Sequence, residues 1–320
     1  MSHAVDMHCD TISRLWRMRQ EGTPQSLRKS SLCVDLEKMR AGGYLLQNFA
    51  MFVFLSSETD PLVNVLELID EYYRQISAHP DLVSPVYTYA DIEKNKAEGK
   101  LSALLTVEEG AVCKGSVEVL RDLYRLGVRM MTLTWNFENE LGYPGTTAKN
   151  RPGKDPGLKE RGIEFVREMN RLGMIVDVSH LGDGGFWDVV KYCDGPFVAS
   201  HSNARAVCGH TRNLTDEMIR ALADKGGVMG INFCADFLRE KNGGSIEDMI
   251  RHMKHIKTVG GIGVLGLGTD FDGISNEPEV KDASQMPLLA QAMERSGFTS
   301  EEIDAVFFGN VLRVYRETMK

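Results

Sequence analysis

Short apolar runs alternate with amphipathic stretches along the whole chain. Apolar runs of strand length are typical of buried parallel strands, and apolar positions three or four residues apart are typical of helices that cover a sheet. The pattern predicts strands at 4–8, 45–55, 103–107, 129–134, 174–178, 197–200, 227–233 and 263–268. It predicts helices at 34–41, 62–77, 116–126, 157–172, 184–192, 216–225, 245–258, 285–295 and 300–317.

Eight strands that alternate with helices predict an α/β fold, a (β/α)8 TIM barrel of the metal-dependent hydrolase type. No linker rich in Pro, Gly or Ser divides the 320 residues, so we expect a single catalytic domain over 1–320. An insertion at about 136–156 follows the fourth expected strand and carries three Pro-Gly pairs. A long loop of this kind is more often functional than accidental, so we interpret it as a lid or substrate wall. A plain surface insertion is the alternative.

Charge and composition narrow the class of partner. Lys and Arg total 37 against 45 for Asp and Glu, and this net charge of −8 argues against nucleic acid and anionic membranes. No apolar stretch is long enough to span a membrane, and the first residues lack the pattern of a signal peptide. The six cysteines form no Cys-x-x-Cys pair, as is usual for reduced thiols. We therefore expect a cytoplasmic protein with a small-molecule substrate and no nucleic-acid or membrane partner.

Histidines and carboxylates stand where several expected strands end. The carboxyl ends of the strands meet at one face of a barrel, and the active site of this fold lies there. Imidazole and carboxylate groups are ligands for zinc and neighbouring divalent metals. Six such groups at converging strand ends therefore predict a metal centre. They are His8, Asp10, Glu108, His180, His201 and Asp270.

The number of these groups favours two metal ions. A single catalytic zinc uses three protein ligands and a water, which leaves several of the six without a role. A central carboxylate bridges two ions well, and Glu108 is our choice for that bridge. Asp270 then fits a proton shuttle between water and a leaving amine. We expect zinc, with other divalent metals open.

Five segments together resemble the membrane (renal) dipeptidase family, zinc dipeptidases of the amidohydrolase superfamily. They are Val5-Asp6-Met7-His8-Cys9-Asp10, Val107-Glu108-Glu109-Gly110, Asp177-Val178-Ser179-His180, the stretch 200–213, and Gly268-Thr269-Asp270-Phe271-Asp272-Gly273. The resemblance covers nearly the whole chain in order. It implies that His8 and Asp10 bind one zinc ion, that His180 and His201 bind the other, and that Glu108 bridges them. It also implies that Asp270 is the catalytic acid and base, and that Arg212 holds the C-terminal carboxylate of the substrate.

Two positions depart from the family's pattern. Better-known members have a His at the end of strand four where this chain has Trp135, which cannot titrate. Activation of the substrate carbonyl then falls to a metal or to a neighbour such as Asn136. The family also often has Tyr where this chain has Cys234. We expect all three residues to contact substrate.

Other residues receive plainer interpretations. Asp177 and Asp272 are expected to orient metal ligands, with simple capping roles as the alternative. Cys9 lies between two ligands and is expected to face the opposite way as a packed thiol. His252 and His255 are interpreted as residues of a solvated helix face.

The sequence thus predicts a dinuclear zinc dipeptidase in which a metal-bridging hydroxide attacks the peptide bond. The alternatives are another metal-dependent amide hydrolase, acting on a lactam or a cyclic amide, and a barrel that binds metal without catalysis. The residue at the C-terminal position of the dipeptide can be L or D. Family members are often homodimers, and the oligomeric state here is open.

Overall fold

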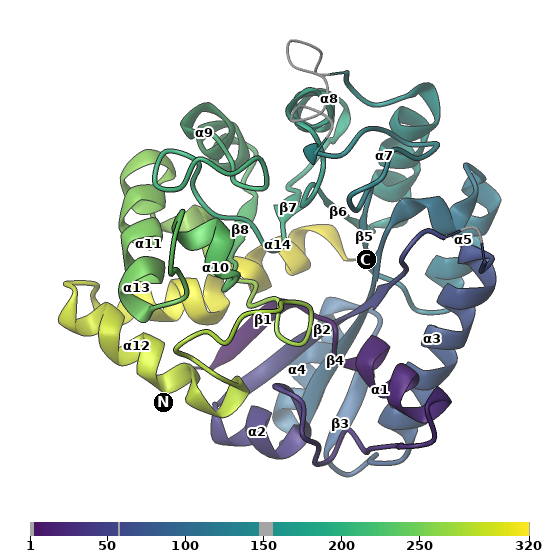
Figure 1. The fold of residues 1–320 in the computed structure, drawn as a ribbon, viewed down its shortest axis with the longest axis horizontal. Coiled ribbons are helices and arrows are strands. Elements are labelled where there is room, and N and C mark those ends of the chain that lie inside the picture. Colours follow the sequence, from purple (N-terminus) through teal and green to yellow (C-terminus); the bar gives the residue numbers. More distant parts are fainter. Residues whose placement is uncertain (1–2, 57, 147–155, 320) are drawn as a thin grey trace.

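The computed structural model describes residues 3–56, 58–146 and 156–319. Within these ranges a parallel sheet of nine strands forms the centre of the molecule, with helices arranged around it (Figure 1). The strands are β1 (Ala4–Cys9), β2 (Tyr44–Phe52), β3 (Val83–Val86), β4 (Leu101–Glu108), β5 (Met130–Thr132), β6 (Ile175–Asp177), β7 (Val198–Ala199), β8 (Val228–Ile231) and β9 (Leu265–Leu267). Pairing of β1 with β9 and of β2 with β4 closes eight of these strands into a barrel. This confirms the expected (β/α)8 fold.

The strand β3 was not expected from the sequence. It pairs with the first half of β4, from Val83 opposite Leu101 onward, while β5 pairs with the second half of β4. Pro85 lies inside β3. Because Pro has no amide hydrogen to donate, it fits an edge strand. The apolar run around Pro85 is too short for the hydrophobic pattern to predict a strand.

The helices follow the expected order with three additions. They are α1 (Thr11–Gln20), α2 (Leu36–Ala41), α3 (Pro61–Ser77), α4 (Tyr89–Ala97), α5 (Val117–Arg125), α7 (Glu160–Leu172), α8 (Asp183–Tyr192), α9 (Asp216–Asp224), α10 (Ala235–Leu238), α11 (Ile246–Gly260), α12 (Met286–Arg295), α13 (Ser300–Asp304) and α14 (Asn310–Thr318). The helices α1, α4 and α10 were missed by the sequence pattern. The helix expected at 300–317 is interrupted by a π-helical segment, Ala305–Gly309.

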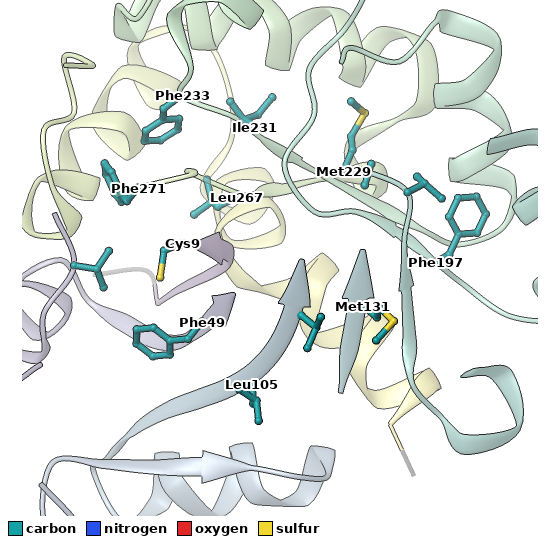
Figure 2. Packing of buried hydrophobic residues seen from close by; sticks show 14 of the residues in the cluster. Cys9, Phe49, Leu105, Met131, Phe197, Met229, Ile231, Phe233, Leu267 and Phe271 are labelled. Carbon is teal, nitrogen blue, oxygen red and sulfur yellow. The ribbon is translucent and has the colours of Figure 1, made fainter. Parts of the chain in front are cut away.

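The outer face of the barrel packs against the helices. Figure 2 shows Cys9 beside Phe49, and the two residues are paired in register on β1 and β2. Both belong to a large apolar cluster that includes Ile12 and Leu15 of α1. Cys9 is fully buried there, which confirms that it is a packed thiol facing away from its neighbours in sequence.

The inner face of the barrel carries a second apolar cluster near the amino ends of the strands. The helix α14 closes this end of the barrel, and Figure 1 shows it crossing behind the strands. The cluster includes Val5, Met7, Leu46, Leu104, Met130, Ile175, Val198 and Val228 from the strands, with Val311, Val314 and Tyr315 from α14. Each fully buried aliphatic side chain of this kind contributes roughly 1.5–3 kcal/mol to folding. The lower half of the barrel is therefore a packed plug.

Two glycines allow β7, β8 and β9 to approach closely. A Cβ atom at Gly230 or Gly268 would overlap the carbonyl oxygen of Ser200. Only hydrogen fits at these two positions. The close approach draws the residues after β7 and β9 toward the same point at the carboxyl end of the barrel.

The insertion after β5 is described only in part, because residues 147–155 lie outside the described ranges. In the described part, Asn139 accepts hydrogen bonds from the amides of Leu141 and Gly142, at 2.8 and 3.1 Å. The amide of Gly145 donates to the carbonyl of His180 at 2.7 Å. These contacts hold the start of the insertion against the barrel mouth, and its function as a lid stays a prediction.

The interpretation of His252 as a surface residue is wrong. Its side chain is fully buried on α11, where Nδ1 accepts a hydrogen bond from the amide of Ala204 and Nε2 lies 3.0 Å from the carbonyl oxygen of Leu238. The sequence pattern failed here because His252 lies on the apolar side of the helix beside Met249 and Ile256. His255 is partly exposed and pairs with Asp216 at 2.7 Å.

No helix in the described ranges is both long and apolar enough to cross a membrane.

Candidate active site

The strand ends bring the six expected metal-binding and proton-transfer residues together. His8 lies in the irregular last part of β1, and its Nε2 lies 3.4 Å from Asp10 Oδ2 and 3.9 Å from Asp270 Oδ1. Glu108 ends β4, and its Oε2 lies 3.5 Å from the same His8 nitrogen. Asp10 and Asp270 therefore form one group around His8 Nε2, which one Glu108 oxygen also faces.

The other Glu108 oxygen faces a second group. Its Oε1 lies 3.0 Å from His180 Nε2 and 3.4 Å from His201 Nε2, and the two imidazole nitrogens are 3.1 Å apart. Glu108 thus stands between two clusters and presents one oxygen to each. This is the arrangement that a bridging carboxylate requires.

Hydrogen bonds outside the cluster fix which nitrogen of each imidazole carries the proton. Ser200 Oγ donates to Asp177 Oδ2 at 2.6 Å, so at 2.7 Å from His201 Nδ1 it accepts the proton of that nitrogen. His180 Nδ1 likewise donates to Asn136 Oδ1 at 2.9 Å. In both histidines the Nε2 lone pair is therefore left free to face Glu108.

Three proton acceptors consequently converge without a donor between them. They are His180 Nε2, His201 Nε2 and Glu108 Oε1. Lone pairs at this separation repel one another unless a cation lies among them. His8 Nε2 and Asp10 Oδ1 are likewise buried without a hydrogen-bond partner. Buried polar atoms without partners are rare and costly, so the donor set fits metal ions.

A glycine makes room for the first group. A Cβ atom at Gly273 would overlap Asp10 Oδ2 and crowd Asp270 Oδ1. The absence of a side chain there leaves a small cradle at the two carboxylates, as a bound ion would need.

The two aspartates that we expected to orient ligands have different surroundings. Asp177 is fully buried and accepts hydrogen bonds from the hydroxyl of Thr132 and the amide of Ser200, besides the hydroxyl of Ser200. It therefore reaches His201 through Ser200. Asp272 instead accepts from Thr11 Oγ1 at 2.6 Å and from the amide of Cys33 at 2.8 Å. Its contacts fasten the start of α1, and its part in orienting a ligand stays a prediction.

Asp6 was not singled out from the sequence. Its buried carboxylate accepts from the amide and hydroxyl of Thr269, at 2.9 and 2.7 Å, and from the amide of His8. It thereby ties β1 to the turn that carries Asp270. A carboxylate inside an apolar strand, two residues before His8, was the available signal.

Backbone strain gathers at this end of the barrel. Of the six non-glycine residues with positive φ in the described ranges, four lie at the site. These four are Glu109, His180, Asp270 and Asp272, with φ of 104°, 68°, 62° and 67°. Such conformations cost about 1–3 kcal/mol each and persist where the surroundings hold them.

Three of the four expected substrate residues lie around the candidate metal-binding cluster. Trp135, Asn136 and Cys234 line a cavity of about 330 Å³ together with Glu108 and Asp270. The Trp135 ring lies 4.9 Å from Phe52 and 5.9 Å from His180 between ring centres, so one wall is aromatic.

Arg212 is buried, and it is not among the residues that line this cavity. It donates to the carbonyl of His201 at 3.1 Å and to Ser202 Oγ at 3.3 Å, while its Nε has no partner. A guanidinium group has five N–H donors, and these two hydrogen bonds leave Nε–H among the donors that remain unused.

Burial and crowding shift the acidity of the cluster. Burial, reinforced by the carboxylates of Asp10 and Glu108, raises the pKa of Asp270 to about 7. Burial, followed by the charge of Arg212, lowers the pKa of His180 to about 4. A carboxyl group whose pKa is close to neutral can both take up and release a proton at physiological pH.

Sequence reasoning missed part of the cavity wall. Ser13, Arg14 and Arg17 of α1 line it. They were missed because α1 itself was not expected, although Ile12, Leu15 and Trp16 follow helical spacing.

A closed β/α barrel with a buried cluster of histidines and carboxylates at its carboxyl face defines the class of metal-dependent hydrolases. The family model described as membrane dipeptidase (peptidase family M19) matches residues 1–320, and the chain belongs to that family.

Known relatives agree with this assignment. An uncharacterised dipeptidase of Schizosaccharomyces pombe is 36% identical over 301 residues, which cover 89% of this chain and 72% of the relative. A crystal structure of a metallopeptidase from Rhodobacter sphaeroides, liganded with a phosphinate mimic of the dipeptide L-Ala-D-Ala, is 26% identical with a TM-score of 0.89. It covers 100% of this chain and 99% of its own. An amidohydrolase from Pseudomonas aeruginosa has 25% identity and a TM-score of 0.80, covering 89% and 92% of the two chains.

The family and these relatives identify the chain as a metal-dependent dipeptidase, and its cofactor is a metal. The expected recognition and enzyme class are thereby confirmed.

Proposed function

We propose that the chain hydrolyses the peptide bond of dipeptides with two zinc ions held at the carboxyl face of the barrel. The observation that carries this proposal is the convergence of three proton-free acceptors, His180 Nε2, His201 Nε2 and Glu108 Oε1. A second group of carboxylates and His8 on the other Glu108 oxygen supports a second ion.

The ligand set would divide at Glu108. His8 and Asp10 would hold one ion, His180 and His201 the other, and each Glu108 oxygen would serve one ion. Metal ions bound there would act as Lewis acids toward the scissile carbonyl and lower the pKa of water toward neutrality. Asp177 and Ser200 keep the Nδ1 proton on His201, so the ligating nitrogen stays bare.

Asp270 is the proposed acid and base. It accepts a proton from the attacking water and delivers it to the amine nitrogen as the C–N bond breaks. Asn232 donates a hydrogen bond to Asp270 Oδ2 at 2.9 Å, which leaves Oδ1 toward His8 and the cavity. The pKa of about 7 suits both halves of this transfer.

The substrate's C-terminal carboxylate is assigned to Arg212. Its unpartnered Nε is a donor available for this task. Trp135, Asn136 and Cys234 would contact the remainder of the dipeptide. The Rhodobacter sphaeroides relative binds a mimic of L-Ala-D-Ala, so we extend the proposal to dipeptides with a D residue at the C-terminal position.

Trp135 favours one alternative function, the hydrolysis of a lactam or cyclic amide. An indole that cannot titrate, packed among aromatic rings, suits a rigid apolar amide such as a lactam or cyclic amide. Such a substrate would need no free carboxylate, so replacing Arg212 would leave its hydrolysis intact.

The test is amine release from a panel of L–L and L–D dipeptides before and after chelation, with metal content measured in parallel. The proposal expects two zinc ions per chain and chelator-sensitive cleavage of dipeptides, with tripeptides and N-acetylated dipeptides spared. Arg212→Ala should abolish dipeptide cleavage. Two bound metals without cleavage of any dipeptide would overturn the proposal, and lactams and cyclic amides would be assayed next.

A further inference from the structure

Helix α1 presents a cationic edge to the cavity. Asp10, Ser13, Arg14 and Arg17 line the cavity at helical spacing, while Ile12 and Leu15 on the other side of α1 are buried in the core. Arg14 and Arg17 are exposed at the cavity mouth. They are three residues apart and therefore neighbours on the helix surface.

Among the residues that the structure describes, neither arginine has a charge partner. Across residues 3–56, 58–146 and 156–319, no hydrogen bond or ion pair involves either guanidinium group. Two like charges at this spacing destabilise a helix by a few tenths of a kcal/mol. The helix dipole favours a cation in the last turn, where Arg17 stands, but Arg14 lies outside that turn. In a chain of net charge −8, two arginines without charge partners in the described residues form a wall of the cavity that suits the binding of an anion.

The carboxylates that line the cavity contact groups other than Arg14 and Arg17. Asp272 accepts hydrogen bonds from Thr11 and Cys33, while Asp10 and Glu108 face His8. A dipeptide has one main-chain carboxylate, and Arg212 is the buried donor assigned to it. A dipeptide with neutral side chains therefore has no second carboxylate that Arg14 and Arg17 could bind.

We infer that Arg14 and Arg17 form a subsite for a side-chain carboxylate, so that the enzyme prefers dipeptides that contain an acidic residue. The inference rests on the proposed function. A guanidinium pair binds a carboxylate through charge-assisted hydrogen bonds, and at a solvated cavity mouth their strength is moderate.

The test compares acidic dipeptides with their neutral isosteres. We would measure kcat/KM for L-Ala-L-Asp against L-Ala-L-Asn and for L-Asp-L-Ala against L-Asn-L-Ala. The preference for the acidic member of one pair should be about tenfold at low salt and should shrink as ionic strength rises. The pair that shows it identifies which residue of the dipeptide reaches α1.

Substitutions at α1 should remove that preference. In the double variant Arg14→Gln/Arg17→Gln the acidic-to-neutral ratio of kcat/KM should fall to about one. The double variant Arg14→Glu/Arg17→Glu should instead prefer a dipeptide with a basic side chain, L-Ala-L-Lys or L-Lys-L-Ala. Arg40→Gln is the matched control, because Arg40 is exposed on α2 and does not line the cavity. It should leave the ratio unchanged.

Binding gives a readout that does not depend on turnover. Calorimetric titration of the acidic and neutral dipeptides into the Asp270→Asn variant should show the same preference, and adding Arg14→Gln/Arg17→Gln should remove it. An equal loss for all dipeptides would overturn the inference, because these arginines would then hold the main-chain carboxylate. An unchanged ratio would overturn it as well.

A different result would overturn the proposed function. If the wild-type enzyme cleaves no dipeptide, the dipeptidase mechanism is wrong. The calorimetric comparison, made then with wild-type protein, still decides whether α1 prefers a carboxylate.

Discussion

The two halves of the barrel interior differ although the same strands build both. Toward the amino ends, Leu104 and its neighbours form an apolar plug closed by α14. Toward the carboxyl ends, Glu108 lies four residues later on the same strand and faces the same way, because side chains alternate with a period of two. It stands in a cluster of histidines and carboxylates. Both halves are largely buried. Burial of the lower half stabilises the fold, whereas the upper half contains polar atoms without hydrogen-bond partners. The residues that stabilise the barrel and the residues of the candidate site thus occupy opposite ends of the strands.

The largest effect is expected at Glu108. Glu108→Gln removes a negative charge that faces both clusters, so bound metal should be lost and activity should fall by about 10³-fold or more. Metal analysis and kcat/KM for L-Ala-L-Ala measure both effects. A variant that keeps two metals and near-normal activity would contradict the bridging role.

Leu104→Ala is the matched change in the lower half. Removing this buried side chain should lower the free energy of unfolding by about 2–5 kcal/mol, because a cavity remains in the plug. Denaturant unfolding measures the loss, while kcat/KM per folded molecule should stay the same. A large fall in metal content would show that the two halves are coupled.

Gly273→Ala tests the space beside the upper cluster. The new Cβ would overlap Asp10 and crowd Asp270, so metal affinity and activity should fall about 10- to 100-fold with little change in fold. Gly195→Ala is the control, since a Cβ there meets no atom within 4 Å. Equal behaviour of the two variants would argue against a cradle at Gly273.

Ser200→Ala tests how the second group is oriented. Without the hydroxyl, His201 Nδ1 loses its acceptor and the tautomer is no longer fixed. We expect about a tenfold loss of zinc affinity, measured by competition with a chelating dye. An unchanged affinity together with an unchanged pH dependence of zinc binding would exclude the orienting role.

His252 should show the smallest effect, because it is buried outside both halves of the barrel. Burial lowers its pKa from 6.5 to about 4 in the folded protein. A depressed folded-state pKa gives stability that is present above pH 6.5 and is lost as the pH falls toward 4. The wild type should lose about 1–2 kcal/mol more than His252→Gln between pH 7 and pH 5, as measured by denaturant unfolding. Parallel curves for the two proteins would contradict this.

Much of the fold could be predicted from the sequence. Apolar runs predicted all eight strands of the barrel, because strands buried on both faces leave a continuous apolar signal. The same signal missed β3, which is short and carries Pro85, and α1, whose cavity side is polar. It also placed His252 on the wrong side of α11.

The sequence by itself determined which residues stand at the strand ends, because strand period and strand order follow from local pattern. His8, Glu108, His180, His201 and Asp270 could be picked out in this way. Tertiary structure alone decided that one Glu108 oxygen faces each group, since that depends on the closure of the barrel. It also decided the histidine tautomers through Ser200 and Asn136, and the placing of Arg14 and Arg17 on the cavity wall. These features arise from side chains far apart in sequence, whose contacts exist only after the strands have closed around one axis.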